Sequence, residues 1–169
     1  IELTETVMQT GPSTIAALRA LRALGVAIAL DDFGTGYSSL TSLEQLPLTR
    51  VEIDRSLIAS IDTSPRSASI ARSIIGLCHS LGLQVTADGI ERPSQLAKLL
   101  ADRGLHIQGY LLSKPLSADE LIGFIESAPA RLQELVLTLP DTPFVPDSTG
   151  AYALRRYRAA VANRLVSPP

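Results

Sequence analysis

Residues 26–40 read VAIALDDFGTGYSSL and join an apolar run, two adjacent aspartates and a glycine-rich segment. The apolar run 26–30 predicts a buried strand, and Asp31 and Asp32 follow it directly. Residues 32–40 predict a loop that leads into a helix, where backbone N–H groups could hold a phosphate. A tight structural turn is the simpler interpretation of two glycines alone. The stretch therefore predicts a strand that delivers two carboxylates to one edge of a sheet.

Short apolar strands alternate with helical patterns on both sides of this stretch. Prolines at residues 12, 65 and 93 and the sequence SADE at residues 117–120 predict the starts of four helices. Glycines predict the ends of the first three. The predicted strands are residues 1–4, 26–30, 50–54, 84–87 and 106–111. This alternation predicts an α/β fold in which parallel strands are joined by crossover helices. It fits both an open doubly wound sheet and part of a (β/α) barrel of about eight strands, and does not choose between them.

The composition predicts a globular protein with a sizeable core, because 46 % of the 169 residues are hydrophobic and 19 % are charged. The net charge of −2 gives no indication of a nucleic-acid partner. A single cysteine, Cys78, cannot form an internal disulfide, which favours a reducing, cytoplasmic compartment. No apolar run reaches the roughly 20 residues that span a bilayer, so we expect no membrane segment here, although a longer parent protein could be anchored.

A change of composition near residue 138 predicts a domain boundary. We expect one α/β domain over residues 1–137, and because its first residues already resemble a strand, the chain is expected to begin inside a fold. Pro140, Pro143 and Pro146 predict an extended linker over residues 138–150. Residues 151–169 carry four arginines and no acid, and their apolar spacing predicts a basic helical tail. We expect this tail to be solvated, with binding to a partner as the alternative.

Carboxylates recur at the carboxyl ends of the predicted strands. They are Glu2, Glu5, Asp31, Asp32, Asp54, Asp88 and Glu91. Parallel α/β folds build their sites at this edge, where clustered carboxylates repel one another unless cations compensate. Hard divalent ions such as Mg²⁺ or Mn²⁺ prefer oxygen ligands, and a pair of ions can activate water against a phosphoryl group. The pattern predicts metal-assisted hydrolysis of a phosphoester, although Asp54 or Glu91 taken singly could simply cap the next helix.

Four segments resemble, in order, the motifs of the EAL domain of bacterial cyclic-di-GMP phosphodiesterases. They are residues 2–5 (ELTE), 31–40 (DDFGTGYSSL), 53–56 (IDRS) and 108–115 (QGYLLSKP). The resemblance covers residues 1–126 and implies a TIM-like (β/α) barrel, of which this chain holds about five of eight strands. It also implies the hydrolysis of cyclic di-GMP to pGpG with two Mg²⁺ or Mn²⁺ ions.

The resemblance implies a role for each matching residue. Glu2 and Asp31 would bind the first metal ion, and Asp31 would bridge to a second ion that Asp32 also holds. Asp88 would be a ligand of the second ion or the general base. Further active-site positions are matched by Asp54, Glu91 and Gln108. The glycine-rich loop, anchored by Glu5, would couple the site to dimerisation and includes Phe33, Gly34, Thr35 and Gly36.

Three departures from the family pattern concern the site. The Glu-Ala-Leu motif and a later asparagine, which normally supply ligands for the first metal ion, are absent from this sequence. Glu52 stands where the family has a lysine that orients the attacking water. Asp88 stands where the family has a glutamate, one methylene longer. A displacement of about 1 Å in such a site costs on the order of 10²-fold in rate.

We therefore expect the C-terminal portion of a cyclic-di-GMP phosphodiesterase domain that is impaired or inactive as this chain. The alternative is a degenerate EAL domain that acts as a non-catalytic cyclic-di-GMP receptor or a regulatory dimerisation module. In both cases we expect a homodimer and further signalling domains in the parent chain. A third alternative is a truncated fragment without activity, because about five of eight barrel strands leave two open edges.

Overall fold

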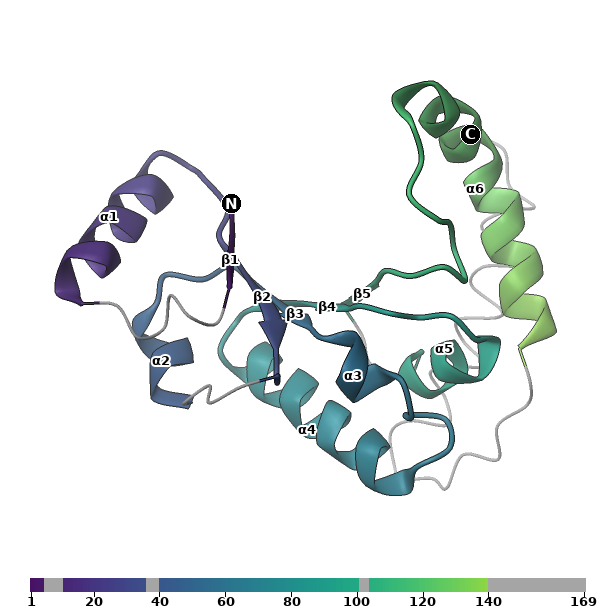
Figure 1. The fold of residues 1–169 in the computed structure, drawn as a ribbon, viewed down its shortest axis with the longest axis horizontal. Coiled ribbons are helices and arrows are strands. Elements are labelled where there is room, and N and C mark those ends of the chain that lie inside the picture. Colours follow the sequence, from purple (N-terminus) through teal and green to yellow (C-terminus); the bar gives the residue numbers. More distant parts are fainter. Residues whose placement is uncertain (5–10, 36–39, 101–103, 140–169) are drawn as a thin grey trace.

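The computed structural model describes residues 1–4, 11–35, 40–100 and 104–139 (Figure 1). In these residues five strands form one parallel sheet in the order β1-β2-β3-β4-β5. The strands are β1 (Glu2–Thr4), β2 (Ala29–Phe33), β3 (Arg50–Ile53), β4 (Gln84–Ala87) and β5 (Leu105–Ile107). Each strand pairs with its neighbour in the chain, whereas a doubly wound sheet reverses its strand order. The order therefore decides between the two predicted architectures in favour of a partial (β/α) barrel.

Helices connect the strands and follow the last one. They are α1 (Pro12–Ala23), α2 (Leu40–Gln45), α3 (Arg55–Ile58), α4 (Pro65–Ser80), α5 (Pro93–Leu99) and α6 (Ala118–Thr138). The four predicted helix starts are confirmed, three of them with proline in the first turn. At the start of α6, Ser117 and Glu120 form the predicted capping box: the Ser117 amide donates to Glu120 (2.8 Å) and the Glu120 amide to Ser117 Oγ (3.4 Å).

Two predicted strands differ by several residues from their bounds in the structure, and β1 and β3 are each one residue shorter than predicted. β2 begins three residues later than predicted, because the Ile28 amide donates to Thr49 Oγ1 (3.0 Å) instead of joining the ladder. The strand consequently runs through both aspartates. β5 ends at Ile107, because the chain turns at Gly109, whose carbonyl oxygen accepts hydrogen bonds from the Leu112 and Ser113 amides. The prediction of a strand through residue 111 was wrong there.

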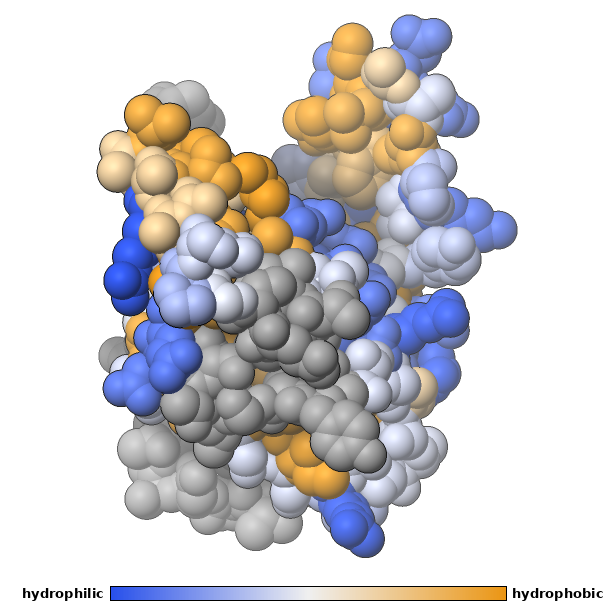
Figure 2. Space-filling view, turned by 60° about the vertical axis from the view of Figure 1, so that its left-hand side comes forward, coloured by the Kyte–Doolittle hydropathy of each residue, from blue (hydrophilic) through white to orange (hydrophobic). Residues whose placement is uncertain are grey.

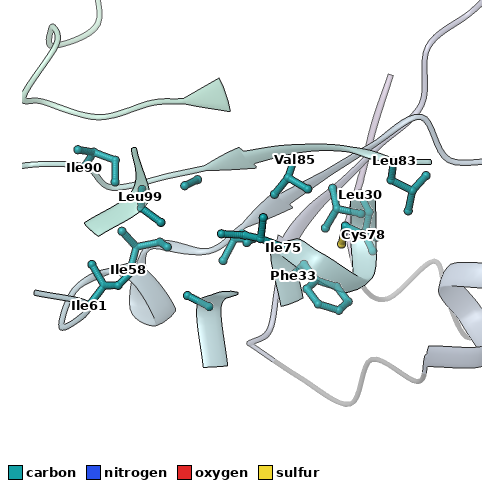
Figure 3. Packing of buried hydrophobic residues seen from close by; sticks show 14 of the residues in the cluster. Leu30, Phe33, Ile58, Ile61, Ile75, Cys78, Leu83, Val85, Ile90 and Leu99 are labelled. Carbon is teal, nitrogen blue, oxygen red and sulfur yellow. The ribbon is translucent and has the colours of Figure 1, made fainter. Parts of the chain in front are cut away.

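One face of the sheet is apolar and packs against helices. Leu30, Val51 and Val85 are all 0 % exposed. Figure 3 shows Leu30 and Val85 beside Ile75 and Cys78 of α4, which belong to the same buried cluster. Helices α3, α4 and α5 lie on this side of the sheet (Figure 1). Removal of this apolar surface from water is the main favourable contribution to folding.

The alternate strand residues give the opposite face a polar character. Glu2, Arg50 and Gln84 lie in one register row, and Glu52 lies beside Thr86 in a later row. Arg50 Nη2 donates a 2.9 Å hydrogen bond to Gln84 Oε1 across the first row. Parallel sheets are ordinarily buried and apolar on both faces. The charged and polar residues on this face are therefore candidates for a functional role.

Among the described side chains of α6, Leu135 near its carboxyl end packs against the core, which Leu139 joins just beyond the helix. Ile122 and Ile125, earlier in the helix, are 66 % and 60 % exposed. Figure 2 shows apolar surface on both sides of an open notch. Across the described ranges, none of the helices combines the length and the apolar character needed to cross a membrane. α6 includes Thr138, one residue beyond the predicted boundary, while residues 140–169 lie outside the described part, so the linker and tail stay predictions.

Candidate functional site

The sheet ladder continues past the strand ends and aligns three predicted site residues. The Asp54 amide donates to the Phe33 carbonyl (3.2 Å), and the Asp88 amide donates to the Ile53 carbonyl (3.1 Å). In the same way the Gln108 amide donates to the Ala87 carbonyl (2.9 Å). Asp54, Asp88 and Gln108 thus lie side by side at the carboxyl edge of β3, β4 and β5. This is the edge at which parallel α/β folds build their sites.

A bulge in β2 brings the two adjacent aspartates to this edge. Leu30 pairs with Val51 and Phe33 pairs with Ile53, so Asp31 and Asp32 together stand opposite one residue of β3. Consecutive strand residues normally point to opposite faces. Asp32 escapes this alternation because its φ of 55° lies in the left-handed region, which aspartate tolerates better than most residues.

The turn after the bulge explains the first glycine of the motif. Gly34 has a φ of 103°, and a side chain there would collide with Leu57 of α3. The Thr35 amide and hydroxyl both bond to the Asp32 carbonyl, at 3.4 and 3.0 Å. Residues 32–35 therefore form a tight structural turn, the simpler of the two interpretations. Gly36 and Glu5, the predicted loop residue and its anchor, lie outside the described residues.

The carboxylates at this edge interact electrostatically. The negative charge of Asp31, followed by burial and the charges of Asp54 and Asp88, raises the pKa of Asp32. Burial, followed by the charges of Asp31, Glu2 and Asp88, raises the pKa of Glu52 above its usual range, although Arg50 opposes this. Burial also acts to raise the pKa of Asp54, but hydrogen bonds from Ser56 and the charge of Arg55 outweigh it and lower the pKa. The edge thus has a strongly negative potential.

Asp54 also has a structural role in this arrangement. It is the N-cap of α3, because its Oδ1 accepts the Ser56 amide hydrogen bond (2.9 Å). The helix-cap alternative is therefore realised for Asp54. Glu91 differs, because its amide donates to the side chain of Gln95 and no cap is formed by its carboxylate in the described structure.

The donor chemistry of the edge suits a hard divalent cation. All of its ionisable donors are carboxylates, and their mutual repulsion is the condition that a cation relieves. Within the described ranges, however, no group of three or more His, Cys, Asp or Glu side chains gathers closely enough to hold a metal ion. Glu2 pairs with Ala29, two register positions before the pair of Thr4 and Asp31. The described residues therefore suit a hard ion by donor type, and the ligand roles predicted for Asp31 and Asp32 stay predictions.

A family model of the EAL domain matches residues 1–115 of the chain. The chain belongs to the EAL domain family. The cyclic di-GMP phosphodiesterase NbdA of Pseudomonas aeruginosa is 44 % identical over 128 residues, which are 75 % of this chain and 16 % of NbdA. The solved EAL domain of Mycobacterium smegmatis DcpA is 38 % identical with a TM-score of 0.70, covering 75 % of this chain and 57 % of DcpA's. The chain thus spans a small part of the first relative's length.

A complex of Klebsiella pneumoniae BlrP1 with manganese and cyclic di-GMP has also been solved. It resembles this chain with a TM-score of 0.62 and 35 % identity, covering 68 % of this chain and 30 % of BlrP1. These similarities confirm the predicted TIM-like barrel. The five-stranded sheet is accordingly a part of an EAL barrel.

Glu52 stands at the position where the family resemblance implies a lysine. It lies in register with Thr86 of β4, whose side-chain hydroxyl is buried and has no hydrogen-bond partner among the described residues. Arg50, the nearest cation on the strand, donates to Gln84 in the row below. The Arg50 guanidinium is therefore bonded in a different register row from Glu52.

Sequence reasoning missed a hydrogen-bonded cluster behind the site. Gln95 of α5 is only 1 % exposed, and Arg92 forms an ion pair with Asp62 at 2.8 Å. The signal for Gln95 was present, because it shares a helix face with Leu99 four residues later, where an apolar residue is expected. A glutamine in that position must have hydrogen-bond partners, because burying an unpaired amide is costly.

Proposed function

We propose that this EAL domain is part of a cyclic-di-GMP phosphodiesterase that opens cyclic di-GMP to pGpG. The observation that carries the proposal is the row of Asp54, Asp88 and Gln108 at one sheet edge. The charges of Asp31, Asp54 and Asp88, together with burial, raise the pKa of the neighbouring Asp32. The names of NbdA and of the BlrP1 complex supply the substrate. A phosphodiester substrate suits a carboxylate edge only with compensating cations, which argues for two Mg²⁺ or Mn²⁺ ions.

Asp31 and Asp32 would hold the ions, with Glu2 on the first and Asp88 on the second. When bound, divalent ions lower the pKa of a water molecule and offset charge on the phosphoryl group. Asp54, Glu91 and Gln108 would line the same pocket, where Asp54 also starts α3. We further propose a homodimer coupled to the site through residues 33–36 and Glu5, in a cytoplasmic parent protein with other signalling domains.

A non-catalytic cyclic-di-GMP receptor is the second candidate, and Glu52 favours it. Its carboxylate adds a negative charge near Asp31, Glu2 and Asp88, where an attacking hydroxide and a phosphate must also be accommodated. Asp88 is shorter than the family's glutamate by one methylene. Both changes leave a nucleotide site in place while weakening the chemistry within it.

Two measurements on the protein expressed with any coding sequence upstream of Ile1 test these proposals. Calorimetry in Ca²⁺ should detect cyclic-di-GMP binding, and the absence of binding would sink both candidates. Chromatography of pGpG formed in Mg²⁺ or Mn²⁺ separates the two. Turnover at the median enzyme rate of about 10 s⁻¹ excludes the receptor, whereas binding without turnover supports it.

A further inference from the structure

We propose that Gln95 is a positioning residue that fixes the Asp88–Glu91 segment against the helix capped by Asp54. The inference deepens the proposed function and rests on it for the identity of the site. It assigns a role to a side chain that lies outside the carboxylate edge and belongs to none of the motifs in the sequence.

The side-chain amide of Gln95 joins two elements of the site. Its Oε1 accepts hydrogen bonds from the amides of Glu91 and Arg92, both at 2.9 Å. Its Nε2 donates to the carbonyl oxygen of Ile58, at 3.2 Å. One buried side chain therefore connects the end of the Asp88–Glu91 segment with α3.

The other end of the connection is the short helix α3. Ile58 is its last residue, and Asp54 is its N-cap, so the bond to Ile58 holds the helix that orients Asp54. Gly89 packs against the same helix: a side chain there would collide with Arg55, and its φ of 77° also favours glycine. The Asp88–Glu91 segment thus packs on α3 directly at Gly89 and is joined to it a second time through Gln95, so we expect the positions of Asp54 and Asp88 to be coupled.

The segment is also hydrogen-bonded to the chain that follows β5. The Ile90 amide donates to the Gln108 carbonyl (3.0 Å), and the Leu111 amide donates to the Ile90 carbonyl (2.9 Å). Gln95 therefore belongs to one hydrogen-bonded network that also includes the backbones of Asp54, Asp88 and Gln108. Because a displacement of about 1 Å can cost on the order of 10²-fold in rate, the position of this segment matters for chemistry.

The ion pair between Arg92 and Asp62 lies nearer the surface than Gln95 and adds bonds at the start of α5. Arg92 Nε and Nη2 donate to the two oxygens of Asp62 at 3.0 and 2.8 Å, and Ser94 Oγ donates to Asp62 at 2.5 Å. Arg92 is 45 % exposed at its side chain, so this pair is partly solvated. Gln95, at 1 % exposure, is the buried member.

Gln95→Leu tests the proposal, since leucine is apolar, of similar size and unable to make any of the side-chain hydrogen bonds of Gln95. Ile75→Ala is the control, because it truncates a buried core side chain of α4 that makes no hydrogen bond to the segment. Both variants are prepared in the protein expressed with any coding sequence upstream of Ile1. Thermal unfolding, amide hydrogen exchange at Glu91 and Arg92, and kcat and KM for cyclic di-GMP are measured well below the unfolding temperature.

We expect Gln95→Leu to accelerate exchange at both amides at least tenfold and to lower kcat on the order of 10²-fold with KM changed less than threefold. Ile75→Ala should lower the unfolding temperature and leave kcat within about a factor of two of the wild-type value. Equal kcat for Gln95→Leu and Ile75→Ala would overturn the proposal, because the role would then be only structural. So would unchanged exchange at the two amides.

A wild-type protein without turnover would refute the proposed enzyme and still leave the inference testable. In that case Mn²⁺ alone is titrated calorimetrically into the wild type and both variants. Affinity weakened about tenfold or more in Gln95→Leu and not in Ile75→Ala supports the positioning role, in line with the effect of outer residues on metal sites. Equal affinities in all three proteins refute it.

Discussion

The amide of Asp32 donates a 2.8 Å hydrogen bond to the carboxylate of Asp31, within a bulge that directs both residues to one sheet edge. The charge of Asp31 is also the largest cause of the raised pKa of Asp32. We therefore expect Asp31→Asn to lower the pKa of Asp32 towards its ordinary value of 3.8. Asparagine keeps the oxygen that accepts the amide, so the bulge should persist. Carbon-detected NMR titration of the Asp32 carboxyl measures the change.

Glu44→Gln, an exposed position in α2, is the matched control for that titration, because it removes a charge that does not act on Asp32. A fall in the pKa of Asp32 of the same size in both variants would show that overall charge, and not the neighbouring carboxylate, is responsible.

The ion pair between Asp62 and Arg92 makes the stability dependent on pH. Hydrogen bonds from Arg92, which outweigh the opposing effect of burial, lower the pKa of Asp62 from 3.8 to about 2. A lowered folded-state pKa gives stability that is present above the unfolded value of 3.8 and lost as the pH falls towards 2. Because the pair is partly solvated, Asp62→Asn should cost only about 1 kcal/mol of unfolding free energy at pH 7.

Urea denaturation of the wild type and Asp62→Asn at pH 7, 5 and 3 checks this prediction. The difference between them should be constant from pH 7 to 5 and smaller at pH 3, about one pH unit below the unfolded pKa. A difference that does not change with pH would mean that the ionised form of Asp62 gains nothing from Arg92.

Gly109 closes the turn after β5 and tolerates no side chain. Its φ is 149°, and a β-carbon would collide with the backbone of Ile90, which is held by hydrogen bonds to Gln108 and Leu111. Gly109→Ala should destabilise the chain by about 3 kcal/mol or more, because the clash is with backbone that cannot move. Gly76→Ala is the comparison: Gly76 lies in α4 with open space around it, and alanine there should stabilise by about 0.5–1 kcal/mol. Chemical denaturation of both variants measures the two signs, and a tolerated Gly109→Ala would contradict the geometry.

Glu52 and Asp88 are the two departures that we expect to limit catalysis. Restoring the family residues with Glu52→Lys and Asp88→Glu together should raise pGpG formation on the order of 10²-fold over the unaltered protein. The lysine replaces an anion whose own pKa is raised by burial and by Asp31, and the glutamate restores the missing methylene. Glu44→Lys makes the same charge change away from the site. No gain from the double variant would mean that neither residue limits the reaction.

Local signals in the sequence were sufficient for most element positions. The prolines at residues 12, 65 and 93 start helices because their missing N–H is not needed in a first turn. The apolar residues of β4 form a strand with the predicted bounds. The bounds of β2 were not predictable in this way, because they depend on Thr49, which is distant in the chain and takes the backbone bonds of Ile28.

The sequence by itself determined the family, the parallel α/β architecture and the identity of the carboxylates, because motif order and strand-end acids are local properties. The barrel-like strand order, which the family resemblance implied and the strand pattern left open, is confirmed by the tertiary structure. Only the tertiary structure decided the bulge that turns Asp31 and Asp32 to one edge and the buried bonds of Gln95. Each of these depends on which backbone groups meet across the sheet. Such pairing is set by packing between distant segments, and the spacing of residues along the chain does not encode it.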